Sequence, residues 1–99
     1  MSILDGILDL TIKKYWFNVI KSGKKTHEYR NTATWSSKLG GKKKDKYHTI
    51  RFRQGQTIKS TDKNNVIYAK ILSISITDGK NTDLNINHEV FDIKFELIK

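Results

Sequence analysis

The sequence contains no cysteine and no proline, and its hydrophobic runs are short. The lack of cysteine excludes disulfides and thiolate metal ligands, and it is typical of a reducing compartment. His27, His48 and His88 are too scattered for a zinc motif, so we expect no metal site and no cofactor. No run approaches the roughly 20 apolar residues that span a bilayer. The first ten residues include Asp5 and Asp9, which a signal peptide would lack. We therefore expect a cytoplasmic protein without a membrane partner.

Positive charge is the most prominent feature of the composition. The chain has nineteen Lys and Arg residues and ten Asp and Glu residues, which gives a net charge of +9. Such an excess attracts polyanions, because each neutralised phosphate releases counterions. Sixteen of the nineteen are lysines. An AT-rich genome also encodes many lysines, whatever the function of the protein. The arginines are more informative, since Arg30, Arg51 and Arg53 fall close together in the sequence.

Alternating apolar and polar residues predict a mainly β domain. Leu8, Leu10 and Ile12 share one face of the first predicted strand. The run 66–76 changes its apolar parity near residues 70–72, which predicts a β-bulge. The predicted strands cover residues 7–13, 26–31, 47–53, 66–76 and 90–97.

Helical spacing is confined to the first half of the chain. Residues 14–22 predict a helix that ends at Gly23. Residues 32–46 have no clear period and predict a basic loop, in which Thr34 could cap a short helical turn. Residues 78–87 predict a polar connection. We therefore expect a mainly β (α+β) single domain over residues 1–99. Its five or six strands would form a small, closed or nearly closed barrel, with one N-terminal helix and a second short helix.

The turn after the predicted helix contains the strongest candidate site. Lys24, Lys25 and the hydroxyl of Thr26 are suited to holding a phosphate. Glu28 and Arg30 share one face of the next strand, where Glu28 could accept from a base and Arg30 could donate to a phosphate or carbonyl. The alternative is structural: the lysines complement the helix dipole, and the two charges form a surface ion pair.

These residues also resemble a known family. The run at 23–30, G-K-K-T-x-E-x-R after a strand and a helix, resembles the opening of ASCH domains in the PUA-like superfamily. Trp35 and residues 47–55 and 91–94 are similar to later elements of small phage and bacterial ASCH proteins, so the resemblance covers about two-thirds of the chain. It implies a PUA-like β-barrel. Relatives are thought to bind RNA or modified nucleobases in a cleft between the barrel and the first helix.

The family's binding residues can be carried over to this sequence position by position. The resemblance then implies a set of ligand-binding residues, in which Trp35 would stack on the ligand. Gln54 and Gln56 stand where the subgroup has Asn and Tyr, which would alter base recognition. Trp16 and Phe17 are expected in the core, and His27 and His88 on the surface. The candidate binding residues are Lys24, Lys25, Thr26, Glu28, Arg30, Trp35, Arg51, Arg53 and Gln54.

Three functions remain open at this point. The favoured one is a module that binds RNA or a nucleotide. The second is a metal-independent ribonuclease with Lys25 and Glu28 as catalytic residues, for which Tyr47 and His48 are also of suitable types, although parity places His48 in the core or at its rim. Hydrolysis of acylated cytidine, known in the family, is disfavoured because Glu28 replaces the threonine nucleophile. The third is a phage-type protein that binds a host protein.

Overall fold

The computed structural model describes residues 6–55, 65–82 and 84–98. The strands are β1 (Ile7–Ile12), β2 (His27–Asn31), β3 (Thr49–Gln54), β4 (Val66–Asp78) and β5 (Glu89–Leu97). The helices are α1 (Lys14–Lys21) and α2 (Thr32–Leu39), with the short 3₁₀ helices η1 (Gly41–Lys46) and η2 (Gly79–Asn81).

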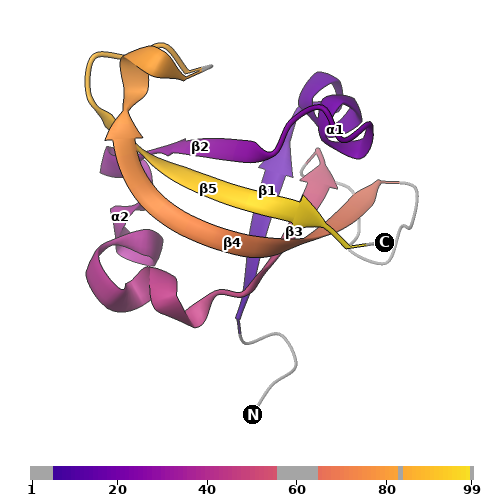
Figure 1. Ribbon diagram of the computed structural model, residues 1–99, viewed down its shortest axis with the longest axis horizontal. Coiled ribbons are helices and arrows are strands. Elements are labelled where there is room, and N and C mark those ends of the chain that lie inside the picture. The colour runs from indigo at the N-terminus through magenta and orange to yellow at the C-terminus, as the bar shows by residue number, and fades with distance from the viewer. Residues whose placement is uncertain (1–5, 56–64, 83, 99) are drawn as a thin grey trace.

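The five strands form one sheet in the order β1-β3-β4-β5-β2. β1 pairs with β3 in parallel, and all other neighbours are antiparallel. The sheet curls into a half-barrel, with α1 and α2 at opposite sides of the view in Figure 1. The mainly β, α+β architecture with an N-terminal helix and a second short helix is confirmed. The barrel is open rather than closed, because β1 and β2 are the two edges of the sheet and do not pair with each other.

The core lies on the concave face of the sheet. Leu8, Leu10 and Ile12 of β1 point into it, as their alternation predicts. The rings of Phe52 and Phe95 pack at 5.0 Å between centroids, so opposite parts of the curled sheet meet there. Among the described residues, the other buried members of this core are Phe17, Ile20, Leu39, Ile50, Ala69, Phe91 and Ile93.

The predicted bulge lies in β4. The pairing of β4 with β5 shifts register between Ile71 and Ser73, within one residue of the predicted position. A bulge bends a strand and increases its twist. It therefore helps this strand of 13 residues to wrap around the core (Figure 1).

The segment 32–46, expected as a basic loop with one short helical turn, is α2 followed by η1. Asn31 rather than Thr34 caps α2, since its side-chain oxygen accepts from the backbone N–H of Ala33 at 2.9 Å. Leu39 is the single buried residue of this helix. One buried side chain in eight residues leaves no helical period to recognise, which explains why the pattern predicts a loop.

α1 follows the prediction closely. Phe17 and Ile20 are buried in the core, and the chain leaves the helix through Gly23 at a positive φ of 83°. Within the described ranges, neither α1 nor any other helix has the length and apolar character needed to cross a membrane.

Candidate binding site

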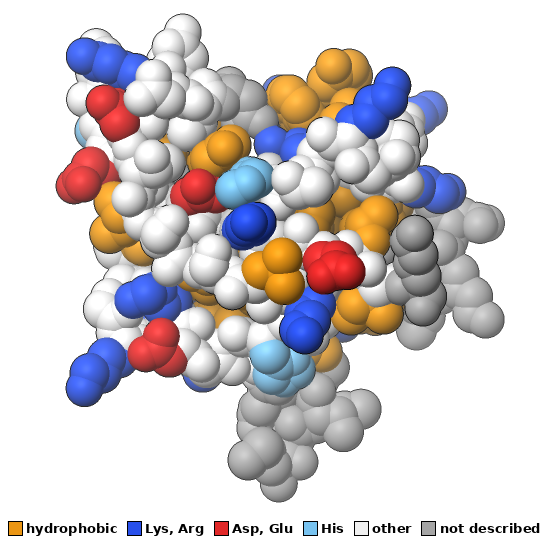
Figure 2. Space-filling model, in the orientation of Figure 1, with side chains coloured by type: hydrophobic (Ala, Val, Ile, Leu, Met, Phe, Trp, Pro, Cys, Tyr) orange, Lys and Arg blue, Asp and Glu red, His pale blue; other side chains and the backbone are white. Residues whose placement is uncertain are grey.

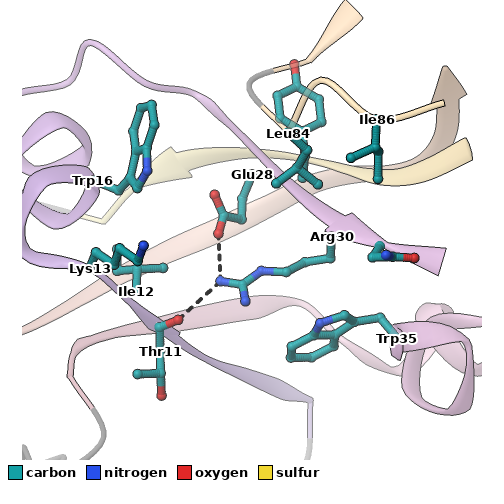
Figure 3. A pocket seen from close by; sticks show the side chains of 11 residues that line it. Thr11, Ile12, Lys13, Trp16, Glu28, Arg30, Trp35, Leu84 and Ile86 are labelled. Carbon is teal, nitrogen blue, oxygen red and sulfur yellow. Dashed lines mark hydrogen bonds and ion pairs between the residues drawn. The ribbon is translucent and has the colours of Figure 1, made fainter. Parts of the chain in front are cut away.

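A pocket of about 470 Å³ opens at the seam where the edges β1 and β2 face each other without pairing. We call it the seam pocket. Residues 11–13 line one side of it and residues 28–31 the other. Trp16 from α1 and Trp35 from α2 complete the walls, together with Leu84 and Ile86 from the connection between β4 and β5 (Figure 3).

Glu28 and Arg30 occupy the centre of the seam pocket. They stand opposite Ile93 and Phe91 of β5 in the register, so both side chains point to the concave face of the sheet. The Arg30 Nη2 donates to Glu28 Oε2 at 2.6 Å, and these side chains are only 18% and 10% exposed. Nη2 also lies 3.4 Å from the backbone oxygen of Thr11, so the Arg30 side chain bridges from β2 to β1 (Figure 3).

The Arg30 guanidinium has a buried donor without a partner. Its Cζ lies 5.2 Å from the centroid of the Trp35 ring, within the range of a cation–π contact. Among the described residues, the Arg30 Nε is the one buried side-chain polar atom that lacks a hydrogen-bond partner. A buried donor without an acceptor is costly, and ligand oxygens are natural partners for it.

Lys25 approaches Glu28 from the other side. Its Nζ lies 3.9 Å from Glu28 Oε1, and its side chain is only 10% exposed. The ammonium lies 5.0 Å from the ring centroid of Trp16 and 5.2 Å from that of Tyr29. Lys25, Glu28 and Arg30 thus form a cation–anion–cation row with a net charge of +1 among aromatic rings.

The other residues of the predicted phosphate turn point elsewhere. The side chains of Lys24 and Thr26 are exposed, and the backbone oxygen of Thr26 accepts from the Phe95 N–H at 2.9 Å. Lys25 and Thr26 line a separate hollow beside Leu72 of β4 rather than the seam pocket. The turn therefore supplies one buried cation to the row and leaves one lysine in solvent.

Arg51 and Arg53 lie outside the seam pocket. They alternate with the buried Ile50 and Phe52, so they occupy the convex face of the sheet. Asp9 on β1 binds both, at 3.0 Å from Arg51 Nη2 and 2.9 Å from Arg53 Nε. The hydrogen bond to Asp9 is the main reason why the pKa of Arg51 is raised above its ordinary value. The structure thus separates these two arginines from Arg30.

The remaining polar candidate, Gln54, stands opposite Ile12 at the end of β3 and does not line the seam pocket. Gln56 lies outside the described residues. The structure therefore brings together Lys25, Glu28, Arg30 and Trp35 of the sequence-predicted set.

Eight of the eleven residues that line the seam pocket were not predicted as site residues, and Trp16, Leu84 and Ile86 are the apolar side chains with most bearing on its walls. Trp16, expected in the core, is half-buried and lines the seam pocket, whereas Phe17 beside it is fully buried as expected. Leu84 and Ile86 come from the segment expected to be a polar connection. The Ile86 N–H donates to the backbone oxygen of Gly79 at 3.2 Å, which folds this segment back toward the sheet. Two apolar residues in a polar stretch are the only sequence signal for this role.

The further candidates for catalysis are dispersed. Tyr47 packs against the core beside a different hollow, near Ile71. His48 is exposed rather than in the core, with its Nδ1 2.7 Å from the Thr49 hydroxyl. His27, expected on the surface, is half-buried and bonds Asp92 at 2.7 Å. None of the three histidines lines the seam pocket. In the described ranges, no group of three or more His, Cys, Asp and Glu side chains is placed to hold a metal ion.

Comparison with known proteins adds no assignment. No protein-family model matches the chain, and no curated protein is significantly similar to it. Function is therefore inferred from the residues of the seam pocket and from the motif at 23–30.

Proposed function

We propose that this protein is an ASCH-type, PUA-like module that binds RNA or a nucleotide by holding a nucleobase in the seam pocket. One observation carries the proposal: two tryptophans, from two different helices, lie on either side of a buried Glu28–Arg30 pair (Figure 3).

The chemistry of the pocket walls suits a nucleobase. An indole face can stack on any base, and such stacking contributes about 1–3 kcal/mol per base. Glu28 accepts hydrogen bonds from ring and amino N–H groups, and Arg30 donates to carbonyl or phosphate oxygens. The volume of about 470 Å³ also falls within the roughly 300–1,000 Å³ of small-molecule sites.

Lysines on both flanks of the pocket supply a path for phosphates. Lys13 lines the pocket rim, and Lys24 is exposed at the end of the α1 turn. On the other flank, Lys38 Nζ lies 5.3 Å from the centroid of the Trp35 ring, and η1 adds further lysines at 42–44 and 46. Figure 2 shows that blue side chains are spread over the visible face rather than gathered in one patch. Such charges position a polyanion without reading its sequence.

The proposal is tested with a matched pair of arginine variants. Arg30→Met removes the guanidinium inside the pocket, and Arg53→Met removes one from the convex face. We expect Arg30→Met to weaken binding of a labelled single-stranded RNA, measured by anisotropy, about tenfold or more. Arg53→Met should change it less than about threefold, while Lys43→Ala should mainly reduce the salt dependence. Equal, small effects of both arginine variants would refute a specific pocket.

The ribonuclease alternative depends on one observation, the contact between Lys25 and Glu28. Pure protein and Lys25→Ala are incubated with labelled RNA in the presence of a chelator. Cleavage by the wild type that is lost in the variant would establish the enzyme. Binding without cleavage would establish the module.

A further inference from the structure

The seam pocket presents a carboxylate flanked by cations. This arrangement of acceptors and donors matches the hydrogen-bonding edge of some bases better than that of others. We propose that the pocket selects guanine. The inference rests on the proposed function, because it names the base that the pocket holds.

Guanine offers two adjacent donors. Its N1–H and N2–H groups point in the same direction and match the two oxygens of one carboxylate, and its O6 acceptor lies next to N1–H. The other bases do not offer this pattern. Adenine and cytosine each place a ring-nitrogen lone pair beside their amino group, and uracil places a carbonyl on each side of its single N–H. A carboxylate that accepts one hydrogen bond from any of these would face a lone pair with its second oxygen.

The structure holds Glu28 in a suitable position. Arg30 binds Oε2 at 2.6 Å and Lys25 lies 3.9 Å from Oε1, so cations at both ends orient a side chain that lines the pocket. An ionised carboxylate has about four lone-pair directions, so it can bind these cations and accept from a ligand as well.

Arg30 supplies the complementary donor. Its Nε–H is buried without a partner and belongs to the same guanidinium that fixes Glu28. A base whose N1–H and N2–H donate to Glu28 would bring O6 toward the Arg30 guanidinium, which lines the same pocket and can donate to it. Trp16 and Trp35 line the same pocket, so their indole rings can contact the base. Guanine thus matches the carboxylate, the guanidinium and the aromatic walls together.

Intrinsic fluorescence gives a direct assay, because both tryptophans of the chain line the seam pocket. The protein is titrated with GMP, IMP, AMP, CMP and UMP. IMP differs from GMP only by loss of the N2 amino group. A correctly placed bidentate contact discriminates between bases by about 5- to 140-fold, so GMP should bind more tightly than IMP by a factor in this range. The other three nucleotides should bind more weakly than GMP.

The outcomes separate the two proposals. Equal affinities for GMP and IMP would overturn guanine selection while leaving nucleobase binding intact. No binding of any nucleotide or RNA would overturn the proposed function itself. Glu28→Gln, whose folding is checked by circular dichroism, should abolish the difference between GMP and IMP, because an amide offers only one acceptor oxygen. If this variant does not fold, the ratio of the GMP and IMP affinities of the wild-type protein still tests guanine selection.

A second arm identifies the source of the base. Hexauridine RNA is compared with the same RNA carrying one central guanosine, using the same fluorescence readout. If the guanosine-containing RNA binds more tightly than both hexauridine and GMP, the ligand is guanine within a chain. If GMP binds and the guanosine adds nothing to the RNA, the ligand is a free guanine nucleotide. Lack of any guanine preference in both arms would refute the inference.

Discussion

The Glu28–Arg30 pair should be strongly coupled in the folded protein, and a double-mutant cycle can measure this coupling. We consider Glu28→Met, Arg30→Met and the double variant, because methionine offers no hydrogen-bonding group in place of either charge. The two side chains are 10% and 18% exposed and bond at 2.6 Å, so each single change leaves a poorly solvated charge without its main partner. Loss of one member of a buried pair costs about 3–5 kcal/mol. We take about 3 kcal/mol for each change, because Lys25 stays near Glu28 and Arg30 is partly exposed.

A hydrogen bond to a charged group contributes about 1.5–3 kcal/mol net, so the coupling energy should be about 2 kcal/mol. The double variant should therefore lose about 4 kcal/mol, less than the roughly 6 kcal/mol sum of the two single changes. These losses are measurable against the roughly 5–15 kcal/mol stability of a domain. Urea unfolding followed by far-ultraviolet circular dichroism gives each value without using the tryptophan signal.

The Asp9–Arg53 pair provides a matched control on the convex face. Its side chains are 30% and 26% exposed at a distance of 2.9 Å, so solvent screens the pair more strongly. The same cycle there should give a coupling of about 0.2–1 kcal/mol. A coupling below about 0.5 kcal/mol for Glu28 and Arg30, no larger than that of the control, would refute their burial in a common pocket.

Three further changes probe how the pocket is built. Leu39→Ala should cost about 2–5 kcal/mol in urea unfolding and weaken ligand binding, because Leu39 anchors the helix that carries Trp35. Gly79→Ala should cost about 1–3 kcal/mol and lower affinity, since an added Cβ would lie 2.7 Å from the Ile86 side chain. An unfolding midpoint equal to wild type would contradict either expectation. Asn31→Ala removes the N-cap of α2 and should cost about 1 kcal/mol in the same assay, whereas unchanged stability would show that the cap is dispensable.

Much of the sheet could be predicted from local alternation. A strand with one buried face places apolar residues at every second position, which is why Leu8 and Leu10 in β1 and Phe95 in β5 indicate their strands directly. The change of parity near Ile71 predicts the bulge for the same reason. Alternation also predicts that Glu28 and Arg30 share a face. It does not tell which face is concave, because that depends on how distant strands pair.

The seam pocket shows where local patterns stop being informative. Arg51 and Arg53 are near Arg30 in sequence, yet the pairing of β3 with β1 places them beside Asp9 on the convex face. Ile86 reaches the pocket through a hydrogen bond of its own backbone to Gly79, which no periodicity encodes. Contacts between segments that are distant in the sequence determine where these side chains lie. Local sequence patterns therefore could not predict their positions.

The open seam has a consequence for how copies of the chain behave at high concentration. An uncovered strand edge is a template on which another chain can add, and proteins commonly guard such edges with inward-pointing charges. Glu28 and Arg30 stand on the edge strand β2 and point inward, and the Arg30 guanidinium contacts a backbone oxygen of the opposite edge. The same charges that would receive a ligand thus also discourage fibrous self-association, so replacing them with apolar residues would endanger solubility along with recognition.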